Sequence, residues 1–251
     1  TIDIIAGEKA GIIKPGIPVV MAPQQAAAER VVIKQALQRD APVIRVELDA
    51  DQIEVNNTTG TSFKWRGNQF SVSLYGQHQA WNACCALETV RTFDPIIEAK
   101  VLAAGLFMVK WPGRMQKLQK NPTVFYDVAH NRQGILTVLD ILAELFPVSP
   151  AGVFVMKGDK DSHLIAEAIK NRLDSLIITG DDSAGLMAAD KLYKTLKKTG
   201  LNCELIPDFQ EASAALQTRI SGDRPGIIFG SHYIAAKVYD NFEFSFESGI
   251  I

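Results

Sequence analysis

The sequence predicts an α/β protein whose second part is built on a mostly parallel sheet with helices on both faces. Beyond residue 112, short apolar segments alternate regularly with amphipathic ones, which is the pattern of strands and crossover helices. The chain has 251 residues, of which 47% are hydrophobic and 22% charged. This composition is that of an ordinary globular protein, and the length suits one large domain or two of ordinary size.

The first part of the chain mixes helices with short strands. Ile2, Ile5 and Ile12 recur near helical spacing, so we expect a helix at the start, and the Pro-Gly pair at 15–16 ends it. The chain opens on Thr1 inside this pattern, and we therefore expect further sequence before it in the parent protein. The elements expected next are a strand at 17–21, a helix at 26–39, a strand at 43–46, antiparallel strands within 51–75, and helices at 78–93 and 96–108.

A domain boundary is expected at 111–114, which reads Trp-Pro-Gly-Arg. A proline followed by a glycine ends a helix and allows a sharp change of direction. The two parts are therefore 1–111 and 112–251. In the second part we expect strands at 123–127, 152–156, 175–179, 203–206 and 226–229, followed respectively by helices at 133–146, 162–173, 184–198, 209–220 and 232–241.

Charge and cysteine content argue against several classes of partner. The formal net charge of -2 gives no bulk attraction to nucleic acid or to an anionic membrane. No run of about 18 apolar residues and no signal peptide is present, so we expect a cytoplasmic protein without a membrane partner. The three cysteines, Cys84, Cys85 and Cys203, are odd in number and lack metal-ligand spacing, and we expect them to be small core residues.

Polar residues gather at three strand-to-helix junctions, 127–131, 156–161 and 230–233. Ligands of parallel sheets bind at the carboxyl ends of the strands, so we expect these junctions to lie along one edge. Their carboxylate, amide, imidazole, ammonium and hydroxyl groups, together with helix N-termini that favour anions, suit a nucleotide and a carboxylate substrate. A simpler interpretation is open as well: Asp127 or Asn131 could serve as the cap of the helix that follows and have no role in ligand binding.

The motifs GEKAGIIKPGIPVV, GQHQAWNACCALE, WPGRMQ, YDVAHN, GDKD and FGSHY occur in this order. Together they resemble the folylpolyglutamate synthase/dihydrofolate synthase family, relatives of the Mur ligases, over residues 1 to about 239. The resemblance implies the remainder of a Mur-ligase-type central ATPase domain at 1–111 and a Rossmann-like glutamate-ligase domain at 112–251. The chain has no Gly-x-x-x-x-Gly-Lys-Ser/Thr loop, which the resemblance places before residue 1 together with further metal ligands and the pterin-binding segment.

The resemblance implies a ligase that uses ATP and Mg²⁺ to phosphorylate a carboxylate of dihydropteroate or of a folate. The amino group of L-glutamate then attacks the acyl phosphate, and an amide, ADP and phosphate result. We expect a monomer whose partners are these small molecules, and we expect the chain alone to be inactive or nearly so. Two alternatives stay open: a UDP-muramyl-type amino-acid ligase and a non-catalytic nucleotide-binding fragment.

The resemblance also assigns ATP contacts and catalytic residues. Asn82 is implied near the adenine, Arg114 at the phosphates and Asp127 at the nucleotide, while His130 is implied as a catalytic residue beside the transferred phosphate. An arginine suits this task because its planar fork matches phosphate oxygens. Lys9 matches a lysine that is carbamylated in the family, and only that modification would turn it into an anionic ligand for Mg²⁺.

The remaining candidates concern glutamate and the metal ion. By similarity, the carboxylates of glutamate are expected near Asn131, Lys157, Lys160 and Ser231. His78, at the start of its helix, is a further candidate for the metal.

Overall fold

The computed structural model describes residues 1–158, 161–181 and 185–244. The chain divides into two compact units, Thr1–Val109 and Lys110–Ile251. Each unit has a core of its own. Within the described residues, no helix is both long and apolar enough to cross a membrane.

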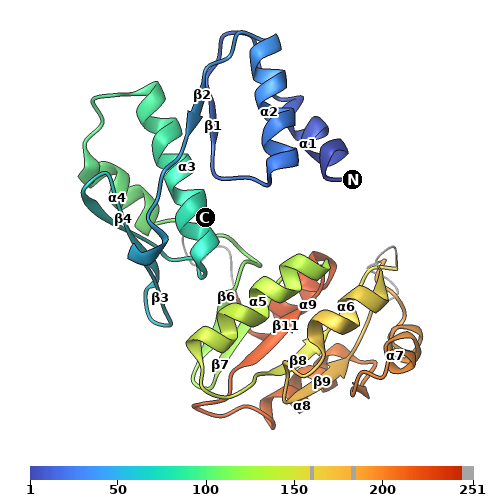
Figure 1. Cartoon of the computed structure of the whole chain (residues 1–251). Helices are drawn as coiled ribbons and strands as arrows, with labels where there is room; N and C mark the ends of the chain where they lie inside the picture. Colours follow the sequence, from blue (N-terminus) through green and yellow to red (C-terminus); the bar gives the residue numbers. More distant parts are fainter. Residues whose placement is uncertain (159–160, 182–184, 245–251) are drawn as a thin grey trace. The chain divides into compact units, whose positions relative to one another are not determined.

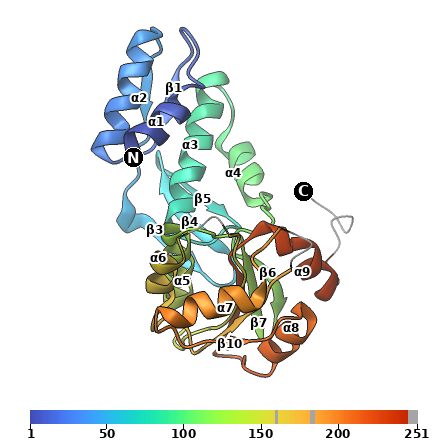
Figure 2. The ribbon, with the colours of Figure 1, turned by 90° about the vertical axis from the view of Figure 1, so that its right-hand side faces the viewer.

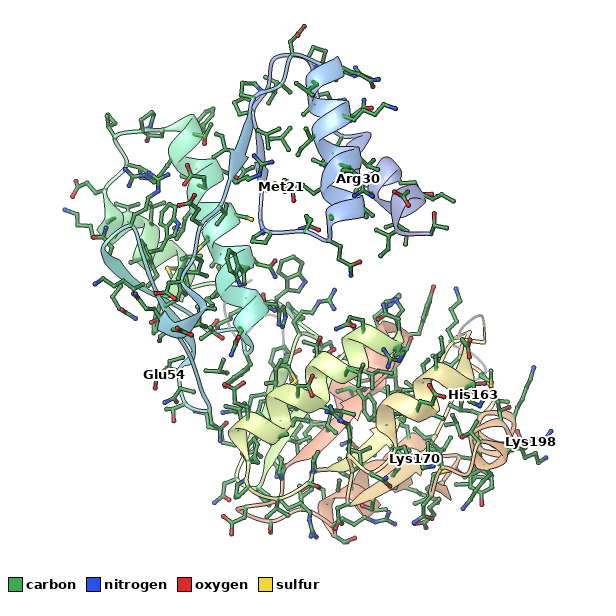
Figure 3. The ribbon with its side chains drawn as sticks, in the orientation of Figure 1. Met21, Arg30, Glu54, His163, Lys170 and Lys198 are labelled. Atoms are coloured by element: carbon green, nitrogen blue, oxygen red, sulfur yellow. The ribbon has the colours of Figure 1, made fainter. Side chains whose placement is uncertain are left out.

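The first unit opens with two helices and a pair of short parallel strands. α1 and α2 pack side by side in both ribbon views (Figure 1, Figure 2). Ala10 of α1 and Ala36 of α2 are small buried residues of one core cluster, and they allow this close approach. Figure 3 marks Met21 on the first strand and Arg30 on the second helix. The bounds are α1 (Ile2–Ala10), β1 (Val19–Met21), α2 (Ala26–Gln38) and β2 (Val43–Arg45).

The rest of the first unit is an antiparallel sheet packed against two helices, and it confirms the hairpins expected within 51–75. Phe63 and Phe70 stack across neighbouring strands with ring centroids 5.9 Å apart. The two-residue turn Arg66–Gly67 has φ values of 48° and 79°, the sign that tight hairpins require. The bounds are β3 (Ile53–Asn56), β4 (Gly60–Trp65), β5 (Asn68–Val72), α3 (Gln77–Phe93) and α4 (Ala99–Phe107), with a short 3₁₀ helix η1 (Ala50–Gln52) before β3.

The second unit is built on a six-stranded sheet with the order β10-β9-β8-β11-β7-β6. All neighbours are parallel except β6 and β7, so the mostly parallel sheet is confirmed. The antiparallel edge strand β6 was not predicted. The bounds are β6 (Gln116–Lys120), β7 (Thr123–Asp127), β8 (Ala151–Phe154), β9 (Ser175–Ile178), β10 (Glu204–Leu205) and β11 (Gly226–Phe229).

Helices cover both faces of this sheet (Figure 1). Val153, Ile228 and their neighbours on one face form a core with Phe209 of α8 and Val238 of α9. α5 and α6 lie side by side, and α7 packs against α6, β9 and β10. The bounds are α5 (Arg132–Leu145), α6 (Ser162–Ile169), α7 (Ala189–Lys198), α8 (Phe209–Gln217), η3 (His232–Ile234) and α9 (Ala235–Asn241).

Several boundaries differ from the prediction. α6 ends at Ile169 instead of residue 173, and α7 begins at Ala189 instead of residue 184. Figure 3 labels His163 within α6 and the lysines that mark the ends of these two helices, Lys170 and Lys198. α4 begins at Ala99 instead of residue 96, because the Asp94 carboxylate accepts the N–H of Ile96 and holds a turn there.

The cysteine expectation is confirmed only in part. Cys84 and Cys203 are buried, whereas Cys85 is only half-buried, and all three are free thiols. Burial raises the pKa of the Cys84 thiol to about 12. A thiol in this state is not a nucleophile at neutral pH, and we assign Cys84 a packing role alone.

Candidate functional site

The carboxyl ends of β7, β11 and β8 lie next to one another in the second unit. Phe229 at the end of β11 pairs with Asp127 of β7 on one side and with Phe154 of β8 on the other. The described parts of the three polar junctions therefore share one edge of the sheet, as the sequence predicted. Gly230 follows β11 with a φ of 115°, and a Cβ there would lie 1.9 Å from the carbonyl oxygen of Val155, so only glycine fits at this position.

A tight turn presents Arg114 beside this edge. Gly113 and Met115, on either side of Arg114, have φ values of 70° and 43°. The carbonyl of Gly113 accepts the N–H of Val128 at 2.9 Å, and a Cβ on Gly113 would lie 2.6 Å from the Val128 side chain. The turn is thus fixed against the segment after β7, while the Arg114 side chain itself is exposed.

Asp127 holds these two segments together. Its carboxylate accepts the N–H of Met115 and the N–H of Ala129, each at 2.7 Å. The residue is 4% exposed, and this burial raises the pKa of the carboxyl from 3.8 to about 6, while the two backbone hydrogen bonds and the charges of Arg114 and His130 oppose the rise. The interpretation of Asp127 as a cap of the next helix is wrong, because both oxygens are bonded to N–H groups outside that helix.

His130 and Asn131 lie at the start of α5, and both are exposed. Nδ1 of His130 is 3.0 Å from the carbonyl oxygen of Val128. Because a carbonyl only accepts, Nδ1 carries the proton, and in the neutral ring Nε2 is the acceptor. The Asn131 side chain accepts the N–H of Gly134 at 2.8 Å, so the capping interpretation holds for this residue. The helix start also favours nearby negative charge.

Ser231 and Lys157 follow two neighbouring strands, β11 and β8, of which β11 also pairs with β7. Ser231 is 3% exposed, and its hydroxyl oxygen accepts the N–H of Tyr233 at 3.2 Å. The Lys157 ammonium lies 5.4 Å from the centre of the Tyr233 ring. The sequence placed Tyr233 in the FGSHY motif but did not predict a role for it. Lys160, the other lysine predicted here, lies outside the described residues.

Asn82 and His78 occupy the first two turns of α3 in the first unit, and both are exposed. The Asn82 amide donates to the side-chain oxygen of Gln79 at 3.1 Å, and the Gln79 amide nitrogen lies 3.0 Å from Nε2 of His78. The sequence had linked these residues by one motif, and the structure connects their side chains by hydrogen bonds. Gly76, with a φ of 109°, brings the chain into this helix.

Lys9 lies on the exposed side of α1. It lines a cavity of about 410 Å³ whose other walls are largely apolar and include Ile5, Ile13 and Met21. Among the described residues, no cluster of three or more His, Cys, Asp or Glu side chains could hold a metal ion. The described side chains therefore do not form a complete magnesium site, and an unmodified Lys9 adds no anionic oxygen to one.

The second unit matches a known protein family. Residues 113–232 match the family described as Mur ligase, glutamate ligase domain. The dihydrofolate synthase/folylpolyglutamate synthase of Mycobacterium tuberculosis is 30% identical over 206 residues, covering 75% of this chain and 42% of the relative. The enzyme of the same name from Bacillus subtilis is 27% identical over 250 residues, covering 95% of this chain and 57% of the relative. The chain belongs to the folylpolyglutamate synthase/dihydrofolate synthase family.

Solved structures of the family have a fold similar to that of this chain. A folylpolyglutamate synthase from Mycobacterium tuberculosis, complexed with ADP, has a TM-score of 0.84 and 27% identity to this family member, covering 96% of this chain and 59% of that one. The chain spans about half the length of the curated relatives it matches. The UDP-N-acetylmuramoyl-L-alanyl-D-glutamate–2,6-diaminopimelate ligase of Aquifex aeolicus is 28% identical over 125 residues, which is 48% of this chain and 26% of the relative.

Proposed function

We propose that this chain is the C-terminal part of an ATP-dependent ligase that adds L-glutamate to dihydropteroate, to a reduced folate, or to both, through an acyl phosphate. The observation that carries the proposal is the shared carboxyl edge of β7, β8 and β11, which collects Arg114, His130, Ser231 and Lys157. The names of the relatives give the reaction class. By the same argument, 1–111 is the remainder of a central ATPase domain and 112–251 the glutamate-ligase domain.

Arg114 is proposed to bind the phosphates of ATP. Transfer of a phosphoryl group depends on neutralising charge on its oxygens, and a guanidinium offers two parallel N–H groups for this purpose. The backbone on both sides of Arg114 is hydrogen-bonded, while its side chain is exposed and available to a ligand. Asp127, predicted as an ATP-binding residue, is proposed to act at the nucleotide chiefly through the turn that carries Arg114, because its oxygens accept the N–H groups of Met115 and Ala129.

Lys157, Ser231 and the start of α5 are proposed to bind the carboxylates of glutamate. An ammonium, a hydroxyl and a helix N-terminus are all donors that suit carboxylate oxygens. Asn131 contributes by capping α5, which leaves the other N–H groups of the first turn for a ligand. Lys160 is proposed for the same substrate, from its motif alone.

His130 is proposed to lie beside the amine that attacks the acyl phosphate. With the proton on Nδ1 held by the Val128 carbonyl, Nε2 of the neutral ring can accept a proton from glutamate's ammonium group. This step matters because only the neutral amine is a nucleophile. The acyl carbon then loses phosphate as the amide bond forms, so that no atom from water enters the product.

In the first unit, Asn82 is proposed as an adenine contact. Its amide is already oriented by Gln79, so little freedom is lost on binding. A carbamylated Lys9, and His78, are proposed contributors to a Mg²⁺ site. When bound, Mg²⁺ would neutralise charge on the phosphates. We further propose a cytoplasmic monomer that acts on small molecules and binds neither nucleic acid nor membranes.

A UDP-muramyl-type ligase is the second candidate, because the diaminopimelate ligase of Aquifex aeolicus also matches part of the chain. Phosphate release separates the two. The complete gene product receives ATP, Mg²⁺ and L-glutamate, and then dihydropteroate, tetrahydrofolate or a UDP-muramyl substrate in turn. We expect release that requires both glutamate and a pterin compound. Release with the muramyl substrate alone, or with no acceptor at all, would overturn the proposal.

Two substitutions test whether phosphate release depends on the proposed site. Arg114→Ala should abolish most of the release, while Arg39→Ala, which removes an exposed arginine of the first unit, should leave it unchanged. We expect the 251-residue chain by itself to release little or no phosphate, because its sequence lacks a phosphate-binding loop. Normal turnover by that chain would contradict this expectation.

A further inference from the structure

Gln116, the first residue of β6, joins the Arg114 turn to helix α9 of the second unit. Its side-chain oxygen accepts the backbone N–H of Gly113 at 2.9 Å and the hydroxyl of Tyr239, on α9, at 2.8 Å. A backbone N–H can only donate, so the atom that faces Gly113 must be the oxygen of the amide. One acceptor therefore connects two segments that are 126 residues apart in sequence, Gly113 and Tyr239.

The turn needs such support. Met115 is not a glycine, yet its φ is 43°, a left-handed conformation that costs on the order of 1 kcal/mol or more for an ordinary residue. Such a conformation persists only where surrounding bonds hold it. Here the Asp127 carboxylate holds the N–H of Met115, and Gln116 holds the N–H of Gly113. Arg114 lies between these two held residues.

Tyr239 links the same turn to the Ser231 segment. Its ring packs edge-on against Tyr126, with centroids 5.8 Å apart and an interplanar angle of 90°. The Tyr126 hydroxyl in turn donates to the carbonyl oxygen of Ser231 at 2.9 Å. Burial raises the pKa of Tyr239, so its hydroxyl stays a donor at neutral pH. One aromatic pair thus supports both the Arg114 turn and the segment that begins η3.

We propose that Gln116 and Tyr239 are positioning residues that hold Arg114 in the conformation that binds the phosphates of ATP. This inference rests on the proposed role of Arg114. Neither residue touches ATP; both act through the backbone of the turn. Removing the acceptor leaves the N–H of Gly113 and the Tyr239 hydroxyl without their shared partner, so the turn opens more often and Arg114 spreads over several orientations.

A matched pair of substitutions tests the inference. Gln116→Met keeps the size and flexibility of the side chain and removes the acceptor, whereas Gln116→Glu keeps oxygen acceptors for both donors. Gln69→Met, at an exposed position of β5, is the control for a methionine introduced into a strand. Tyr239→Phe removes the hydroxyl that donates to Gln116 and keeps the ring that packs against Tyr126.

Amide hydrogen exchange without nucleotide measures the positioning itself. We expect Gln116→Met to raise the exchange rates of the Gly113 and Met115 amides by about tenfold or more, since the loss of a partly buried hydrogen bond makes local opening easier. Gln116→Glu should restore slow exchange, Tyr239→Phe should have an intermediate effect, and Gln69→Met none. Unchanged exchange in Gln116→Met would overturn the positioning role, whatever the protein binds.

Nucleotide affinity measures what the positioning does. In the complete gene product, Gln116→Met should weaken binding of the non-hydrolysable analogue AMPPNP by about tenfold, leave adenosine binding unchanged, and recover in Gln116→Glu. Combined with Arg114→Ala, it should cause no further loss, because the two residues act as one unit. Independent, additive losses would contradict the inference. If Arg114→Ala alone leaves AMPPNP affinity intact, the proposed function fails, and the exchange experiment still decides the positioning role.

Discussion

Replacing Asp127 by asparagine should change how the stability of the second unit depends on pH. The carboxylate is 4% exposed and accepts the N–H groups of Met115 and Ala129 at 2.7 Å. An asparagine offers one oxygen, so its amide group would face one of these donors and leave it unpaired. That loss costs about 1–3 kcal/mol at any pH.

The pH-dependent part follows from the raised pKa of Asp127. In the folded protein the carboxyl pKa is about 6, against 3.8 for the free side chain. Between these values the folded state binds the proton more tightly than the unfolded state, so its contribution to stability is present at low pH and is lost as pH rises toward 6. At 1.36 kcal/mol per pH unit, the total change is about 3 kcal/mol.

The assay compares the free energy of unfolding of the wild type and of Asp127→Asn at several pH values between 4 and 8. Urea unfolding is monitored by hydrogen exchange of the β7 amides, which reports on the second unit. We expect the advantage of the wild type over the variant to shrink by up to about 3 kcal/mol from low to neutral pH and then to stay constant. Asp223→Asn, at an exposed position, is the control. An advantage that grows as pH rises would refute the reasoning, because it would mean that the bonds and charges around Asp127 outweigh its burial.

Three further substitutions, one of them with a matched control, test the fold of the two units. Gly230→Ala should destabilise the second unit by about 4 kcal/mol or more in urea unfolding, since its Cβ would lie 1.9 Å from a carbonyl oxygen, whereas Gly222→Ala, with no atom within 4 Å, should be almost neutral; equal effects would contradict this account. Asn131→Ala should cost about 1 kcal/mol through loss of the α5 cap, and hydrogen exchange at the Gly134 amide should report it. Gly105→Ala, in the open interior of α4, should raise thermal stability by about 0.5–1 kcal/mol, and a decrease would show a crowding that the structure does not contain.

The parallel strands of the second unit could be predicted because each is a short apolar run bounded by turn residues. β6 was missed for the opposite reason. Its residues 116–120 read Gln-Lys-Leu-Gln-Lys, and an edge strand needs little apolar surface because only part of it faces the core. α6 was predicted too long since the apolar spacing continues to Leu173, beyond the point where the helix ends at Ile169. The local pattern does not show where a helix must end.

The site was predictable where it depends on strand ends, and not where it depends on contacts between distant segments. The rule for parallel sheets placed Asp127, Lys157 and Ser231 at one edge correctly. The partner of Asp127, the N–H of Met115, is twelve residues earlier in the chain, so the sequence could not separate a helix cap from a link between segments. Tyr239 has no motif of its own, and its bond to Gln116 depends entirely on how α9 packs.

In the proposed reaction, phosphate leaves from an acyl phosphate on the acceptor. The direct measurement uses an acceptor whose carboxylate carries ¹⁸O, with the complete gene product, ATP, Mg²⁺ and L-glutamate, and determines the mass of the released phosphate. We expect one ¹⁸O atom to be transferred to phosphate for each amide formed, since the carboxylate oxygen that attacks the γ-phosphorus leaves with it. Amide formation with unlabelled phosphate would contradict the acyl phosphate, and the absence of any amide with every acceptor would contradict the ligase.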